Sequence, residues 1–291
     1  MDGAELAEIL ALARAAVGPA TVLVTQPYIG VEKLSVDEIT RKDGQLPKII
    51  WLLWWQGWDK PVPYVVAKVF QSWRLHNEAH GWQIIALDES NIGQFIDVPH
   101  KPSFSLQALS DVIRVTLLAR FGGVWADASM ICLRPLDEWV WDAIEPVGFW
   151  TYHGRDEGHG PASWFIISVS SSLIIQKWKA MCDEYISCHD EPDDYFWLDR
   201  LFEEERVQNS EGELAATWRR VPYLYCEDKG SAHYAVGRVG DPVDDDFREH
   251  VNESRRPHAM KLCWRAPLSD ASDHIGNYVI RLALGARWKD C

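Results

Sequence analysis

The segment SLQALSDVIRVTLLARFGGVWADASMI, residues 105–131, constrains the fold of this chain more than any other. Its apolar residues recur at helical spacing, Ser105 is suited to cap the first turn of the helix, and Gly122 is suited to end it. A short β-prone run, 124–126, follows and leads to Asp127. This is where a strand of an open α/β sheet would end, and such sheets bind ligands at that edge. We therefore expect Asp127 at a ligand-binding edge.

Two charged residues of the expected helix share one face. Asp111 and Arg114 are three positions apart, so they are neighbours on the helix surface. Such a pair is often only a solvated ion pair of small energetic value, and Asp127 alone could simply close a strand. Together, however, they place an acid, a base and a second acid at one sheet edge. A carboxylate there can hold a sugar or ribose hydroxyl, or a divalent cation that bridges phosphates.

The first half of the chain alternates between strand and helix patterns. Strand 48–54 is almost continuously apolar, as buried parallel strands are. The alternation indicates one large α/β domain. Further elements are expected as follows: helices 63–77, 89–96, 136–144, 171–188, 193–206 and 276–287, and strands 82–87, 147–152 and 164–169. Residues 221–275 are rich in Gly, Pro and Asp without clear periodicity, and we expect them to form loops that fold over the sheet edge.

Composition excludes some classes of protein. A formal net charge of −14 repels nucleic acid and anionic membranes. The 16 tryptophans favour a carbohydrate or nucleotide ligand, although core packing explains many of them equally well. The six cysteines contain no C-x-x-C pair, so the pattern indicates neither a zinc site nor a disulfide framework. Two histidines, His76 and His80, have helical spacing, but the Glu lies at the wrong offset for a zinc helix.

The N-terminal residues 4–17 form an amphipathic pattern interrupted by charges. They lack the basic start and uncharged apolar stretch of a signal peptide, and no run approaches the ~20 apolar residues that span a bilayer. We expect this helix to cap the domain or to pair with a second subunit in a homodimer. The expected location is cytoplasmic, with no transmembrane segment.

Three ordered blocks of the chain carry a resemblance to a known family. Residues 110–129, SDVIRVTLLARFGGVWADAS, look like the core motif of the capsular polysaccharide synthesis proteins. These are GT-A glycosyltransferases related to the sugar-transferring domains of clostridial toxins and to mannosyltransferases with DxD-type motifs. Residues 46–57 resemble the opening strand of these families, and residues 61–73 resemble the helix that follows. With weaker matches at 194–196 and 261–262, the resemblance covers roughly residues 46–265.

The resemblance implies a fold and an activity. The fold is α/β, of the GT-A, Rossmann-like nucleotide-sugar-binding type, with a mixed central sheet and added helices. Residues 1–45 would be an N-terminal helix and lead-in segment, and residues 46–291 the glycosyltransferase domain. The activity would be transfer of a hexose from a nucleotide-diphosphate sugar, such as a UDP-sugar, to the hydroxyl of a glycan or small molecule, with retention. The alternative is a non-catalytic nucleotide-sugar-binding protein on this scaffold; a metal-dependent hydrolase is a third, weaker interpretation.

The resemblance also implies roles for individual residues. The catalytic group would be Asp127, Asp111 and Arg114. Donor-binding residues would be Trp54, Gln56, Ser110, Asp111, Arg114, Gly123, Asp127, Ser129 and Lys261. Acceptor-side residues would be Asp194, Asp199 and Trp164.

Metal binding is the one place where the sequence departs from the wider superfamily. Many members carry Asp-x-Asp, whose second Asp binds Mn2+ or Mg2+, whereas this chain has Asp127-Ala128-Ser129. A serine hydroxyl is a weak cation ligand beside a carboxylate. The expected cofactor is Mn2+ or Mg2+ on Asp127.

Overall fold

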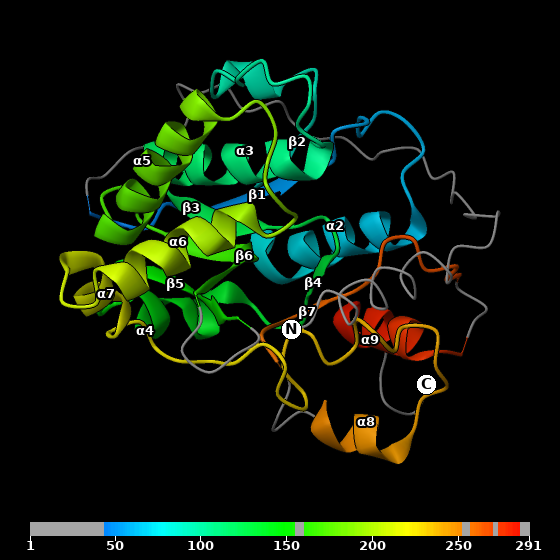
Figure 1. Cartoon of the computed structure of the whole chain (residues 1–291). Coiled ribbons are helices and arrows are strands. Elements are labelled where there is room, and N and C mark those ends of the chain that lie inside the picture. The colour runs from blue at the N-terminus through cyan, green and yellow to red at the C-terminus, as the bar shows by residue number, and fades with distance from the viewer. Residues whose placement is uncertain (1–43, 155–159, 252–256, 270–272, 286–291) are drawn as a thin grey trace.

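The computed structural model describes residues 44–154, 160–251, 257–269 and 273–285 (Figure 1). The helix expected over residues 4–17 and the homodimer contact expected of it lie outside these residues. The expected boundary between residues 45 and 46 stays a prediction. No helix within the described ranges has both the length and the apolar character needed to cross a membrane.

A five-stranded mixed sheet forms the centre of the molecule. Strand β1 (Ile49–Leu53) pairs in parallel with β2 (Gln83–Leu87) on one side and with β3 (Gly123–Ala126) on the other. Strand β6 (Pro161–Ser168) is antiparallel to β3, and β5 (Phe149–His153) is antiparallel to β6. The order is therefore β2-β1-β3-β6-β5. This confirms the expected α/β fold with a mixed central sheet.

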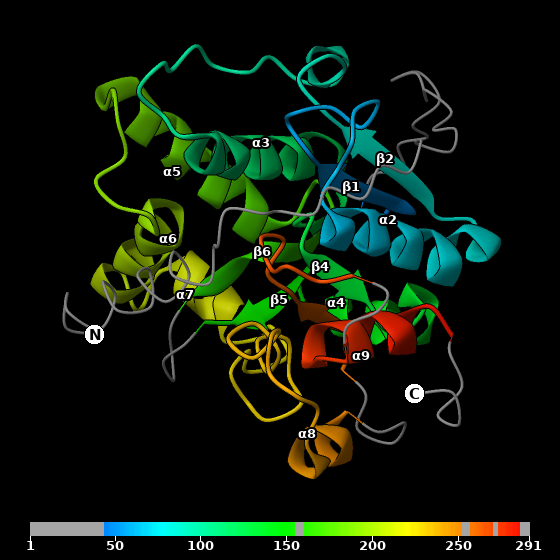
Figure 2. The same cartoon turned by 90° about the vertical axis from the view of Figure 1, so that its right-hand side faces the viewer.

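Helices cover both faces of this sheet (Figures 1 and 2). Helix α2 (Tyr64–Asn77) lies on one side of β1, and α3 (Leu106–Phe121) lies on the other. Helix α5 (Leu173–Cys188) packs on α3, while α6 (Trp197–Gln208) contacts both α5 and β6. The chain thus passes from β1 to β2 on one side, and then crosses over to place β3 on the other side of β1. In such sheets the ligand crevice lies at the carboxyl ends of the strands where the winding reverses, which here is between β1 and β3.

Smaller elements complete the fold. They are the 3-10 turns Glu78–His80, Ile92–Gln94 and Leu136–Glu138, the helices α4 (Val140–Ile144), α7 (Glu213–Trp218), α8 (Asp245–His250) and α9 (Ile275–Ala283), and the strands β4 (Met130–Cys132) and β7 (Ala259–Lys261). Strands β4 and β7 form a separate antiparallel pair, in which Met130 lies opposite Lys261. This pair brings the C-terminal part of the chain next to the end of β3.

Two consecutive glycines make the tight connection from α3 into β3. Gly122 and Gly123 have φ angles of +74° and +105°, which residues other than glycine rarely adopt. A Cβ atom on Gly123 would lie 2.8 Å from the carbonyl oxygen of Ile49 in β1. The indole of Trp51 donates a hydrogen bond to the carbonyl of Gly122 at 2.9 Å. The glycines therefore let β3 start directly beside β1, and the expected helix end at Gly122 is confirmed.

The side-chain cap of α3 and most tryptophans also agree with the sequence. Ser105 Oγ accepts a hydrogen bond from the backbone N–H of Ala108 at 3.2 Å, as expected of an N-cap. Half of the largest fully buried side chains are indoles, and these pack in the core: Trp51, Trp73, Trp82, Trp125, Trp178 and Trp197.

Three sequence-based expectations about secondary structure are wrong. The helix expected over 89–96 is a loop with one 3-10 turn, because Asp88 Oδ1 and Asn91 Oδ1 accept hydrogen bonds from nearby backbone N–H groups. The helix expected from residue 193 begins at Trp197, because Asp194 closes a turn by accepting from the N–H of Phe196. Residues 221–275 contain α8 and β7 in addition to loops.

Candidate functional site

Four charged side chains meet at the carboxyl end of β3. Arg114 lies between two carboxylates, with Nη1 at 2.9 Å from Asp111 Oδ1 and Nη2 at 3.3 Å from Asp127 Oδ1. Lys261 Nζ is 2.8 Å from the other Asp127 oxygen, Oδ2. We call these four residues the Asp127 cluster. Asp111, Arg114, Asp127 and Lys261 were all expected from the sequence, and the structure brings all four together.

The elements that carry the cluster explain its position. Asp111 and Arg114 lie on the face of α3 that turns toward the sheet, and they are only 8% and 5% exposed. This burial excludes the solvated surface pair that spacing alone left open. Lys261 is the last residue of β7. Two backbone hydrogen bonds hold this strand in place, from Lys261 N–H to Ala232 O at 2.7 Å and from Leu262 N–H to Ser129 O at 2.8 Å.

Two indoles donate hydrogen bonds to the cluster, although the sequence did not indicate either tryptophan as a site residue. Trp125 Nε1 donates to Asp127 Oδ1 at 3.1 Å, and Trp197 Nε1 donates to Asp111 Oδ2 at 3.0 Å. The Arg114 guanidinium also lies over the Trp125 ring, 5.3 Å from its centroid. Trp125 lies two residues before Asp127 in the 110–129 motif, so the sequence could have predicted that the two side chains are neighbours. Trp197 is 86 residues from Asp111, and no local pattern links the two.

The charges of the cluster nearly balance. Burial raises the pKa of Asp127, but the positive charges of Lys261 and Arg114 outweigh that effect, so the pKa lies below its ordinary value. Burial raises the pKa of Asp111 to about 6, although Arg114 opposes the shift. Near neutral pH both carboxylates are therefore mostly ionised, and they neutralise the two cations. The cluster as a whole therefore carries little net charge.

Asp199 of α6 lies close enough to interact with the cluster. Burial, the charge of Asp111 and the charge of Asp127 raise the pKa of Asp199 to about 7, against a hydrogen bond from Ser163 and the charge of Arg114. Its Oδ1 atom is buried and has no hydrogen-bond partner among the described residues. The same holds for Nε of Arg114. Buried polar atoms are nearly always paired, so these two atoms are the ones near the cluster that a ligand can satisfy.

The raised pKa of Asp199 predicts a pH-dependent effect on stability. Between the ordinary value of 3.8 and about 7, the folded protein keeps a proton that the unfolded chain has lost. The free energy of unfolding therefore falls as the pH rises through this window. We expect Asp199→Asn, which cannot ionise, to be more stable than the wild type at pH 8 by about 1–3 kcal/mol, with a smaller difference at pH 5. Urea unfolding at both pH values measures this.

Asp194→Asn is the control for this prediction. Asp194 lies just before α6, is exposed and pairs with Arg200, so its replacement should give the same change at pH 5 and pH 8. A difference between Asp199→Asn and the wild type that does not change with pH would contradict the assigned protonation state of Asp199.

Of the other expected donor-binding residues, Ser110 contacts the cluster directly. Trp54 follows β1 and is half-buried, with its ring 5.3 Å from that of Trp264. Gln56 is exposed in the next turn. Ser110 Oγ accepts from Arg114 Nη2 at 3.0 Å. Gly123 opens β3, and Ser129 is buried between β3 and β4.

The expected acceptor-side residues fall into two groups. Trp164 on β6 lies beside the cluster, because its carbonyl accepts from the N–H of Asp127 at 2.9 Å and Lys261 Nζ is 5.2 Å from its ring centroid. Asp199 also interacts with the cluster, as described above. Asp194 is held at the surface by Arg200 and is not among the charges that act on the cluster carboxylates.

The contacts of Asp127 do not fit a divalent cation. Its Oδ1 accepts from Arg114 and Trp125, and its Oδ2 accepts from Lys261. Mg2+ and Mn2+ bind carboxylate oxygens, but each oxygen of this carboxylate already faces a cationic side chain, which repels a further cation. Ser129 adds no negative charge.

The comparison with known proteins identifies the family. The model of the family described as "Capsular polysaccharide synthesis protein" matches residues 26–280, and this chain belongs to that family. Membership supports glycosyl transfer at the level of the family. The chain is also similar to a solved structure titled "PaToxG Glycosyltransferase", with 14% identity, a TM-score of 0.38, and coverage of 60% of this chain and 73% of that one. No curated protein matches the sequence.

Proposed function

We propose that this protein is a glycosyltransferase of the GT-A type that moves a hexose from a nucleotide-diphosphate sugar, first among them a UDP-sugar, to an acceptor hydroxyl. The observation that carries the proposal is the Asp127 cluster at the crevice between β1 and β3. It combines carboxylates that can accept hydrogen bonds from sugar hydroxyls with cations that can bind a diphosphate. The family assignment supports the same class of reaction.

The proposed roles follow from the contacts. Asp111 and Asp127 accept hydrogen bonds from hydroxyls of the donor. Lys261 has three N–H donors and uses one on Asp127, so it can bind a phosphate oxygen as well. In the reaction, the bond between the anomeric carbon and the diphosphate oxygen breaks, and a bond to the acceptor oxygen forms. Lys261 and Arg114 stabilise the charge that develops on the departing diphosphate.

The orphaned atoms near Asp199 suit a sugar. A hydroxyl group both donates and accepts, so sugar hydroxyls are suited to pair with Arg114 Nε and with Asp199 Oδ1. We place Asp199 on the acceptor side of the site. Trp164 and Asp194 stay acceptor-side predictions, and Trp54 with Gln56 stay predictions for the nucleotide end of the donor.

We expect retention of the anomeric configuration. The carboxylates of the cluster are each held by a cation and an indole, which makes them poor nucleophiles. The departing diphosphate can take the proton of the acceptor hydroxyl on the same face of the sugar. The anomeric proton coupling in the product, measured by NMR, distinguishes retention from inversion.

Nucleotide release from a panel of UDP- and GDP-sugars tests the proposal. We expect release from one donor, at a comparable rate with and without added Mn2+, because Lys261 and Arg114 supply the positive charge. The superfamily pattern gave the opposite expectation of a Mn2+ or Mg2+ requirement, so this comparison decides between the two. Absolute dependence on Mn2+ would contradict the metal-free site.

The same panel separates the enzyme from the non-catalytic alternative. A transferase leaks some transfer to water even without its acceptor, whereas a binding protein raises its melting temperature with one donor and releases no nucleotide. If no donor of the panel releases nucleotide and none raises the melting temperature, nucleotide-sugar binding is contradicted.

A further inference from the structure

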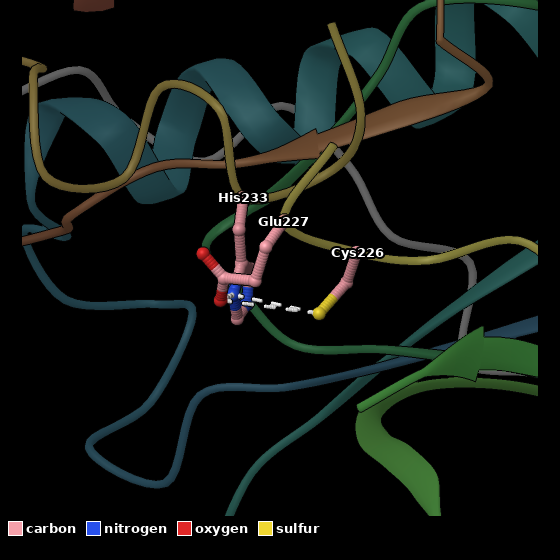
Figure 3. Close-up of side chains that lie close together, drawn as sticks. All are labelled: Cys226, Glu227 and His233. Carbon is pink, nitrogen blue, oxygen red and sulfur yellow. Dashed lines mark hydrogen bonds and ion pairs between the residues drawn. The ribbon is translucent and has the colours of Figure 1, made fainter. Parts of the chain in front are cut away.

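Three metal-ligating side chains from one loop converge outside the Asp127 cluster (Figure 3). Glu227 Oε1 lies 2.7 Å from His233 Nδ1, and Cys226 Sγ lies 3.8 Å from the same nitrogen. The sulfur is 4.0 Å from the Glu227 oxygen. All three ligand atoms therefore lie within 4.8 Å of one another. Figure 3 shows the three side chains pointing toward a common centre.

Hydrogen bonds that do not involve the three ligand side chains hold this loop closed. His233 N–H donates to Cys226 O at 2.8 Å, and Ser231 Oγ donates to Tyr225 O at 2.6 Å. On the outer side, Cys226 N–H donates to His153 O at 3.2 Å, and Ala232 O accepts from Lys261 N–H. The three ligands are thus brought together by the fold, so a bound ion would not have to organise the loop.

The geometry argues against a nucleophilic triad. In a Cys-His-Glu triad, the thiol and the carboxylate contact different ring nitrogens of the histidine. Here both Cys226 Sγ and Glu227 Oε1 approach Nδ1 of His233. One nitrogen that faces a sulfur and a carboxylate oxygen is instead the arrangement of ligands around a cation.

The separations suit a tetrahedral ion. Ligands at about 2.0–2.3 Å from Zn2+ lie roughly 3.3–3.8 Å from one another in a tetrahedral site. The distances from Cys226 Sγ, 3.8 and 4.0 Å, are close to this range. The distance from Glu227 to His233 is shorter, as expected when a proton joins the two groups, and it would lengthen when an ion replaces that proton.

We propose that Cys226, Glu227 and His233 bind a zinc ion. A thiolate, an imidazole and a carboxylate together favour Zn2+ over Mg2+ or Ca2+. On binding, the Cys226 thiol releases its proton to solvent, and His233 binds through Nδ1 with its proton on Nε2. The Glu227 side chain is 30% exposed, so the ion can enter from solvent and a water molecule can complete the coordination.

The proposed ion lies next to the candidate site without belonging to it. His233 stacks on Trp164, with ring centroids 4.6 Å apart, and Lys261 Nζ lies over the same Trp164 ring. Zinc would therefore fix the loop 225–233 against the residues that hold Lys261. The proposal stands on the ligand geometry alone and is independent of the proposed glycosyl transfer.

The metal content of the purified protein tests the proposal. After dialysis against excess Zn2+ and then buffer, we expect one zinc per chain by elemental analysis in the wild type. Cys226→Ser and His233→Gln should each weaken zinc affinity at least about 100-fold. Cys182→Ser is the matched control, since Cys182 is also a buried cysteine outside any disulfide but lies in α5, and this variant should keep its zinc.

Cobalt substitution provides a readout that does not require the variants to fold. Wild-type protein loaded with Co2+ should show the thiolate-to-cobalt charge-transfer band and the intense visible bands of a tetrahedral site. Absence of both zinc and the cobalt spectrum in the wild type would overturn the proposal. So would unchanged zinc content and cobalt spectrum in folded Cys226→Ser.

Discussion

Asp127→Asn should abolish the proposed sugar transfer and leave the protein folded. Asn keeps the shape of the side chain but loses the charge that holds Arg114 and Lys261 on either side of it, at 3.3 and 2.8 Å. It also loses one of the acceptor oxygens proposed for the donor. We expect the rate of nucleotide release to fall at least about 1,000-fold, while the free energy of unfolding falls by about 1–3 kcal/mol.

Asp137→Asn is a closely matched control for this substitution. Asp137 accepts from Lys48 Nζ at 2.7 Å and from the indole of Trp82 at 2.9 Å, as Asp127 does from Lys261 and Trp125. The two carboxylate side chains are similarly exposed, 24% for Asp127 and 26% for Asp137. Asp137→Asn should therefore lose comparable ion-pair energy with full transfer activity. Full activity in Asp127→Asn, or equal loss in both variants, would contradict the site.

Lys261→Met should have the second-largest effect, about a 100- to 1,000-fold loss of kcat. Methionine keeps an unbranched apolar stem against Trp164 and removes the ammonium that we propose stabilises the departing diphosphate. The charge on that group grows in the transition state, so kcat should fall more than KM rises. Steady-state kinetics with the donor identified by the panel measure the two parameters separately.

Lys48→Met is the corresponding control for Lys261→Met. It breaks the Lys48–Asp137 pair, which has the same chemistry, and it should leave both kcat and KM unchanged. A rise in KM at constant kcat in Lys261→Met would assign Lys261 to ground-state binding and would contradict its role in the transition state.

The sequence predicted the local parts of the site well. The spacing of Asp111 and Arg114, the Gly122-Gly123 pair and the position of Asp127 are all determined within one helix, one turn and one strand. Helical period, glycine conformation and strand length decide such features over a few residues. The first strand, α2 and α3 were expected within one or two residues of their observed bounds for the same reason.

The parts that depend on distant residues could not be predicted in this way. The indole of Trp197 reaches Asp111 only because α6 packs on α5 and β6. Lys261 was expected from a weak match to the family, but β7 pairs with β4 across about 130 residues of chain, and the region around it had no periodicity. The group Cys226, Glu227 and His233 was missed because its ligands do not follow a C-x-x-C spacing.

The pairing of β7 with β4 has a consequence for protein synthesis. The ribosome makes the chain from its N-terminus, so Asp111, Arg114 and Asp127 emerge long before Lys261. Until residues 259–261 add to β4, the nascent sheet carries one more negative than positive charge at the crevice, and this repels an anionic nucleotide sugar. The growing chain therefore acquires affinity for its proposed donor only after residues 259–261 have been made and have paired with β4.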